Sequence, residues 1–141
     1  SMSVHGLALR RAITQRLRAD AGVTALVAAD RIYGDEPPAE PEWPFVKYLS
    51  LPVLPYESSC GRGDEATVQI SAFAYGPGTD DIWAIASAIR EALDDASLTL
   101  ATGIDLVSID WTSTQILREP DVDASAYHAA VQIRAITVEA T

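Results

Sequence analysis

The residues most able to do chemistry lie in one stretch, 58–89, which reads SSCGRGDEATVQISAFAYGPGTDDIWAIASAI. It holds Cys60, which is the single cysteine of the chain, the triplet Arg62-Gly63-Asp64, and the glycines Gly76 and Gly78. A cysteine beside glycines could be a nucleophile, and the triplet could be an adhesion signal. Glycines ahead of a helix could hold a phosphate. Each of these interpretations competes with a purely structural one.

Cys60 is predicted to be a loop thiol that does no essential chemistry. The two histidines, His5 and His128, fall on a predicted N-terminal helix and a late strand, so no base is expected beside the cysteine. The positive charge of Arg62 is offset by acidic neighbours, which leaves little to lower the pKa of the thiol. A Cys/His pair brought together by the fold stays open at this point.

The other motifs are incomplete. Gly76 and Gly78 lack the third glycine of a dinucleotide fingerprint and the Gly-Lys-Ser/Thr ending of a phosphate loop, so they are interpreted as a strand-to-helix turn. The Arg-Gly-Asp triplet is short, and no secretion signal accompanies it. Asp121 and Asp123 supply too few oxygens for a calcium loop. We therefore expect no catalytic residue, no metal site and no cofactor.

The charge balance narrows the class of protein. Ten basic and twenty acidic residues in 141 give a formal net charge of −10, which repels nucleic acid and anionic membranes. No apolar run approaches the roughly 20 residues that span a bilayer, so a soluble protein is expected. The length predicts one domain over residues 1–141, with Ser1 an expression scar.

An amphipathic helix is predicted over residues 4–20, because Leu9, Ile13 and Leu17 recur on one stripe and Gly22 follows as a plausible cap. The opposite face mixes an apolar residue with arginines: Leu7, Arg11 and Arg18. That face could be solvated or could contact another subunit.

The middle of the chain reads as loops and two strands. A short helical turn is expected over 24–29, and four prolines make 35–44 a loop. A strand is predicted over 45–51, bounded by prolines. Alternating apolar residues predict a second strand over 66–75, and 58–66 is expected to be an exposed loop between them.

A second amphipathic helix is predicted from Ile82 to Ala96, with Thr79 or Asp80 as its N-cap. Trp83 points away from the apolar stripe and shares its side with Arg90. The tryptophan either covers a sheet edge within the subunit or anchors a partner, since Trp and Arg are enriched at interface hot spots.

Two further strands are predicted around 107–112 and 127–135, and the turn-rich segment 118–126 should join them as an antiparallel hairpin. The order of elements predicts an α+β domain with a mostly antiparallel four-stranded sheet and helices packed on one face.

This order also resembles a known family. The segments VTALVAADRIYGDEPPAEPEWPFVKY, ATVQISAFAYGPGTDDIWAIASAIREAL and AYHAAVQIRAITVE are similar to the tail completion, or tail terminator, proteins of long-tailed phages, prophages and gene transfer agents. The most specific part runs from Arg31-Ile32-Tyr33 through the acidic proline loop to Trp43-Pro44-Phe45-Val46. The loop around Cys60 matches no pattern shared by the family.

The resemblance implies a structural role. Such a protein forms a homo-hexameric ring on the last ring of the tail tube, stops tube growth, and presents a surface to the head-completion or connector protein. It implies a place at the head–tail junction of the virion tail, in the bacterial cytoplasm before assembly, with no enzyme activity and no membrane. DNA would pass through the acidic ring without specific binding.

The residues expected in the contacts between subunits or with partners are Leu7, Arg11, Arg18, Trp83 and Arg90. The alternative interpretation is a small-molecule-binding α+β regulatory domain.

Overall fold

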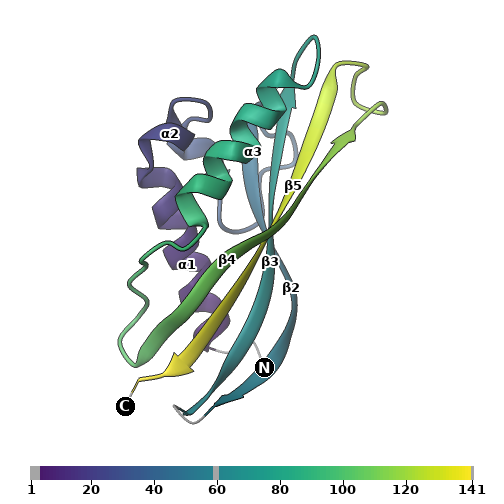
Figure 1. The fold of residues 1–141 in the computed structure, drawn as a ribbon. Coiled ribbons are helices and arrows are strands. Elements are labelled where there is room, and N and C mark those ends of the chain that lie inside the picture. The colour runs from purple at the N-terminus through teal and green to yellow at the C-terminus, as the bar shows by residue number, and fades with distance from the viewer. Residues whose placement is uncertain (1–3, 59–60, 141) are drawn as a thin grey trace.

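The computed structural model describes residues 4–58 and 61–140. Its elements are α1 (Val4–Ala19), α2 (Ala21–Thr24), a 3-10 helix (Ala29–Arg31), β1 (Ile32–Tyr33), β2 (Phe45–Ser58), β3 (Gly61–Tyr75), α3 (Asp80–Leu93), β4 (Ile104–Arg118) and β5 (Ala126–Glu139). The strand order is β1-β2-β3-β5-β4, and the helices lie on one face of the sheet (Figure 1). The predicted α+β class is confirmed.

The sheet has five strands rather than the predicted four, because residues 32–33 add a short strand. β1 runs parallel to β2, with Ile32 opposite Val46, whereas the other three strand pairs are antiparallel. A strand of two residues has no periodicity of its own. It exists because β2 offers it a partner, which only the tertiary fold decides.

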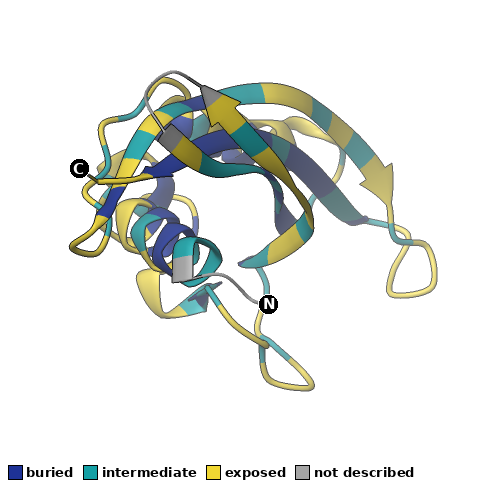
Figure 2. Ribbon diagram, turned by 90° about the horizontal axis from the view of Figure 1, so that it is seen from below, coloured by how far each residue is buried: buried dark blue, intermediate teal, exposed yellow. Residues whose placement is uncertain are grey.

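The core lies between the helices and the face of the sheet that they cover, which we call the inner face. Leu9, Ile13 and Leu17 of α1 are fully buried against it, as their spacing predicted. Alternate residues of β3 and β5, including Ile70 and Ile133, complete the core from the sheet. Figure 2 shows the buried residues gathered where the curved sheet arches over the helices.

β2 and β3 form a long hairpin that corrects two predictions. β2 does not end at Leu51 but continues through Pro52 and Pro55 to Ser58, with a register irregularity between Ser50 and Val53. Beyond its short contact with β1 it is an edge strand, which tolerates prolines at bulges and where the N–H would face away from the sheet. The pairing continues to Ser58 opposite Gly61, so most of the predicted loop 58–66 is strand.

The helix ends also differ from the prediction. Gly22 is not a C-cap, because it lies inside α2, whose N-cap is Asp20 with its carboxylate accepting from the Val23 N–H at 3.0 Å. Thr79 is the N-cap residue of α3, as one of the two predictions had it, but its side chain makes no capping hydrogen bond. α3 ends at Leu93, three residues before the predicted end.

Candidate assembly surfaces

The Arg-Gly-Asp triplet lies in strand β3 and not in a loop, while Cys60 lies outside the described residues. Gly63 is opposite Val138 of β5, and a Cβ on it would lie 1.8 Å from the carbonyl oxygen of Thr137. The glycine therefore permits the close approach of the two strands. Within residues 4–58 and 61–140 no three His, Cys, Asp or Glu side chains gather as a metal site would require.

Asp64 of the same triplet faces the beginning of α1. His5 Nδ1 lies 2.9 Å from Thr137 Oγ1 and 3.9 Å from Asp64 Oδ2. These polar contacts fasten the first turn of α1 to β3 and β5, so the triplet has a structural use in this fold.

The face of the sheet without helices, which we call the outer face, carries an aromatic layer of Trp43, Phe45, Phe73, Tyr75 and His128. The strand register places Phe45, Phe73 and His128 opposite one another across three strands. Their rings stack with centroids 4.6 and 4.4 Å apart, and Trp43 stacks on Tyr75 at 4.4 Å. Sequence reasoning missed this layer, although Phe73 and Tyr75 occupy the non-core positions of their strand.

His128 is the polar member of the aromatic layer. Burial lowers the pKa of its imidazole, and Lys47 adds to the effect, whereas the Glu119 carboxylate 3.3 Å from Nδ1 opposes it. Among the described residues, Nε2 is buried without a hydrogen-bond partner. The neutral imidazole is therefore the form that the folded chain favours.

Two of the predicted contact residues lie on α3. Trp83, in its first turn, is 47% exposed, so it covers little of its own subunit. Arg90 lies over the ring of Trp111 in β4, 3.6 Å from the ring centroid, and Asp94 accepts a hydrogen bond from the Trp111 N–H. Arg90 thus already serves to hold α3 against β4.

The other three lie on α1. Arg18 donates to the Ile32 carbonyl oxygen at 2.6 and 2.9 Å and so fastens α1 to β1. Leu7 and Arg11 instead border a hollow of about 340 Å³, which we call the α1 hollow. Its lining residues are Leu7, Ala8, Arg11, Ala12, Gln15, Thr99, Leu100 and Ala101.

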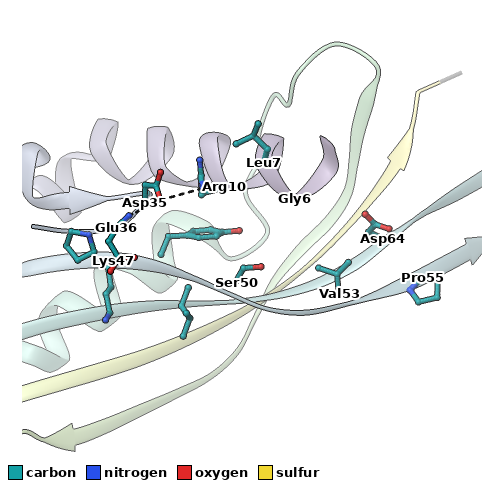
Figure 3. Close-up of a pocket in the computed structure, with 14 residues that line it drawn as sticks. Gly6, Leu7, Arg10, Asp35, Glu36, Lys47, Ser50, Val53, Pro55 and Asp64 are labelled. Carbon is teal, nitrogen blue, oxygen red and sulfur yellow. Dashed lines mark hydrogen bonds and ion pairs between the residues drawn. The ribbon is translucent and has the colours of Figure 1, made fainter. Parts of the chain in front are cut away.

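A larger hollow of about 670 Å³ lies between the first half of α1 and β2 (Figure 3). Arg10 and Asp35 point toward one another there, 3.9 Å apart, whereas the Lys47 side chain points away from α1. Burial raises the pKa of the Tyr48 phenol, which lines the hollow and stays protonated. This is where a regulatory domain would hold a ligand.

Comparison with known proteins decides between the two interpretations. The model of the family described as "Tail completion protein gp17" matches residues 11–138. The chain belongs to this tail completion family. Its fold is also similar to a chain in a solved structure described as "Virion of native gene transfer agent (GTA) particle", with a TM-score of 0.82 and 29% sequence identity. The match covers 97% of this chain and 98% of that one, and no curated protein matches.

Membership of the tail completion family confirms the resemblance seen in the sequence. The family is a structural one of virion tails, so the expectation that the chain is not an enzyme is confirmed as well. No described helix is long and apolar enough to cross a membrane.

The free energy of unfolding of this tail completion protein is expected to fall on mild acidification because of His128. Its pKa in the folded chain lies below the ordinary 6.5, so the unfolded state binds more protons. Stability present above pH 6.5 should be lost as the pH falls through the folded-state pKa. His128→Phe keeps a ring against Phe73 and should remove this part of the dependence in urea unfolding curves. A variant with the same pH profile as the wild type would contradict the assignment.

Proposed function

We propose that this chain caps the tail tube as a homo-hexameric ring, ends tube growth, and provides the surface to which the head is joined. The observation that carries the proposal is the family match over residues 11–138, together with the likeness of nearly the whole chain to a chain of a gene transfer agent virion. Its partners are the tail tube protein and the head-completion or connector protein. The protein would lie at the head–tail junction, after synthesis in the bacterial cytoplasm.

The charge of the chain supports this role. Six copies at −10 carry a charge of about −60, and an acidic ring repels passing DNA. DNA would therefore cross the ring without specific binding. The same charge makes copies repel one another, so the contacts between subunits must lie where the local charge is favourable.

We also propose that the contacts within the ring and with partners include Leu7, Arg11, Arg18, Trp83 and Arg90. Four of these residues are exposed and Leu7 is half-buried. The guanidinium groups of Arg18 and Arg90 already contact their own subunit, so Trp83 and Arg11 are the better residues to substitute.

Removal of the gene tests the proposed function. Without a cap, filled heads should accumulate apart from tails, and some tails should grow longer than normal, as seen by electron microscopy. Supplying the gene from a plasmid should restore joined particles. Joined particles with tails of normal length in the deletion strain would overturn the proposal that this chain caps the tube and joins the head.

A further inference from the structure

The turn between β4 and β5, residues 119–125, is a preformed knob that we call the tip. The Val122 and Asp123 N–H groups donate to the Glu119 carbonyl oxygen at 3.0 and 3.2 Å. The N–H and hydroxyl of Ser125 donate to the Asp123 carboxylate at 2.9 and 2.8 Å. These bonds lower the pKa of Asp123, which stays ionised. A turn held this way loses little conformational entropy on binding.

The tip presents one apolar side chain among acids. Val122 is 54% exposed, and it lies between the exposed residues Asp121 and Asp123. A half-exposed valine at the end of a hairpin contributes nothing to its own core. Its surroundings suit a partner surface that is apolar in the centre and basic at the rim.

The α1 hollow has that character. Its lining residues are alanines, leucines, a threonine and a glutamine, with Arg11 as the charged group and no acid. α1 as a whole carries four arginines and no acidic residue, in a chain whose net charge is −10. Arg10, Arg16 and Arg18 have acceptors within the subunit. Arg11 is exposed and makes no ion pair with any described residue, so its charge is available.

The tip cannot occupy the α1 hollow of its own subunit. Thr99–Ala101 in the hollow lie just before β4 in the chain, and the tip follows β4 directly. The 15 residues of β4 span about 45 Å at roughly 3.3 Å per residue, less some twist. Figure 1 shows the two ends of β4 at opposite ends of the molecule.

We infer that the tip of one copy inserts into the α1 hollow of the next copy, with Val122 against the apolar lining and Asp121 beside Arg11. The inference rests on the proposed ring. Because the tip and the hollow are different surfaces at opposite ends, the contact is heterologous, and each added copy leaves one of each free until a ring closes.

The position of Trp83 agrees with this arrangement. The Gly76 N–H donates to the Ser125 carbonyl oxygen at 2.9 Å, and α3 begins four residues later at Asp80. The first turn of α3 therefore lies at the tip end of the molecule, and Leu7 and Arg11 lie at the hollow end. Trp83 thus lies at the end of the molecule that carries the tip, whereas Leu7 and Arg11 lie at the end that carries the hollow, as a head-to-tail interface requires.

The sheet edges are poorly suited to the alternative, in which copies pair strand to strand. β4 has register irregularities at Leu106/Ser108 and Trp111/Ser113, and β2 has one at Ser50/Val53 besides its two prolines. Bulges and prolines on an edge are features that prevent pairing with another chain. Copies are therefore expected to assemble through side-chain contacts, such as that between the tip and the α1 hollow.

Cysteine cross-linking tests the inference directly. In a Cys60→Ser background, Leu100→Cys together with Val122→Cys should give on oxidation a ladder of covalent oligomers that ends at the ring number. Each single cysteine variant should give only monomer, and a mixture of the two only dimer. Cross-linking by Val122→Cys alone would indicate tip-to-tip contact and overturn the inference, as would the absence of any ladder.

Charge-reversal variants test the contact between the tip and the α1 hollow independently of whether the chain forms a ring. Asp121→Arg and Arg11→Glu should each raise the concentration needed for half-maximal assembly at least tenfold, measured by native mass spectrometry, and the double variant should return to within about threefold of wild type. Glu40→Arg and Arg62→Glu, at exposed positions elsewhere, are the matched controls. Normal rings from both single variants would overturn the contact and leave the ring intact. A wild-type chain that forms no ring, alone or with tail tubes, would overturn the proposed function as well.

Discussion

Gly63→Ala is expected to lower the free energy of unfolding by more than about 3 kcal/mol, or to prevent folding altogether. The added Cβ would lie 1.8 Å from the Thr137 carbonyl oxygen, 2.8 Å from its carbonyl carbon and 2.9 Å from a methyl group of Val138. Two of these atoms are backbone atoms of β5, which is held between β3 and β4 and cannot yield. Overpacking against fixed atoms exceeds the usual 1–3 kcal/mol range.

Gly78→Ala is the matched control for this substitution. No atom lies within 4 Å of the Cβ that it would add, and its backbone is not in the left-handed region. Its stability should change by less than about 1 kcal/mol, because alanine meets no atom there and lowers the entropy of the unfolded chain. Urea unfolding of both variants by circular dichroism makes the comparison. Similar small losses in both would mean that β3 and β5 separate easily at Gly63.

The parts of the fold that the sequence predicts well are those whose signal is local. The stripe of Ile82, Ile85 and Ile89 places α3, and the alternation of Val68 and Ile70 places the buried part of β3, because burial has a period of 3.6 in a helix and of 2 in a strand. The last hairpin follows from two such strands around a polar turn.

The parts of the fold that the sequence does not predict depend on residues far away in the chain. A proline has no backbone N–H, so Pro52 and Pro55 interrupt a strand only where a neighbouring strand needs that donor. That β2 is an edge strand at these residues follows from the sheet topology and not from the local sequence. The stacking of Phe73 on both Phe45 and His128 needs the register of three strands, which no single segment specifies.

The candidate surfaces likewise combine features that the local sequence predicts with features that depend on distant residues. Leu7 and Arg11 follow from helical spacing alone, because they lie off the apolar stripe of α1. The hollow beside them needs Thr99–Ala101, from a loop about ninety residues away, and no helical pattern indicates it. The contact of Arg90 with Trp111 was equally hidden, since Arg90 lies on helix α3 and Trp111 on strand β4.

Trp83→Ala is expected to weaken assembly about 30-fold or more while leaving the unfolding free energy within about 0.5 kcal/mol of wild type. Truncating a tryptophan that is a hot spot of an interface costs about 2 kcal/mol or more of association free energy, whereas removing a half-exposed side chain from a helix surface costs the fold little. Trp83 is 47% exposed, and no aromatic or cation–π contact joins it to another described residue.

Tyr75→Ala is the informative comparison, because Tyr75 is also 47% exposed but stacks on Trp43 with centroids 4.4 Å apart. Its loss should lower the unfolding free energy by about 1–2 kcal/mol through the lost stacking and burial. Unfolding curves and native mass spectra of both variants, recorded at matched concentrations, separate the two effects. If Trp83→Ala loses stability and assembly together, as a core residue would, the tryptophan belongs to the packing of its own subunit and the tip end of the ring contact must be sought elsewhere.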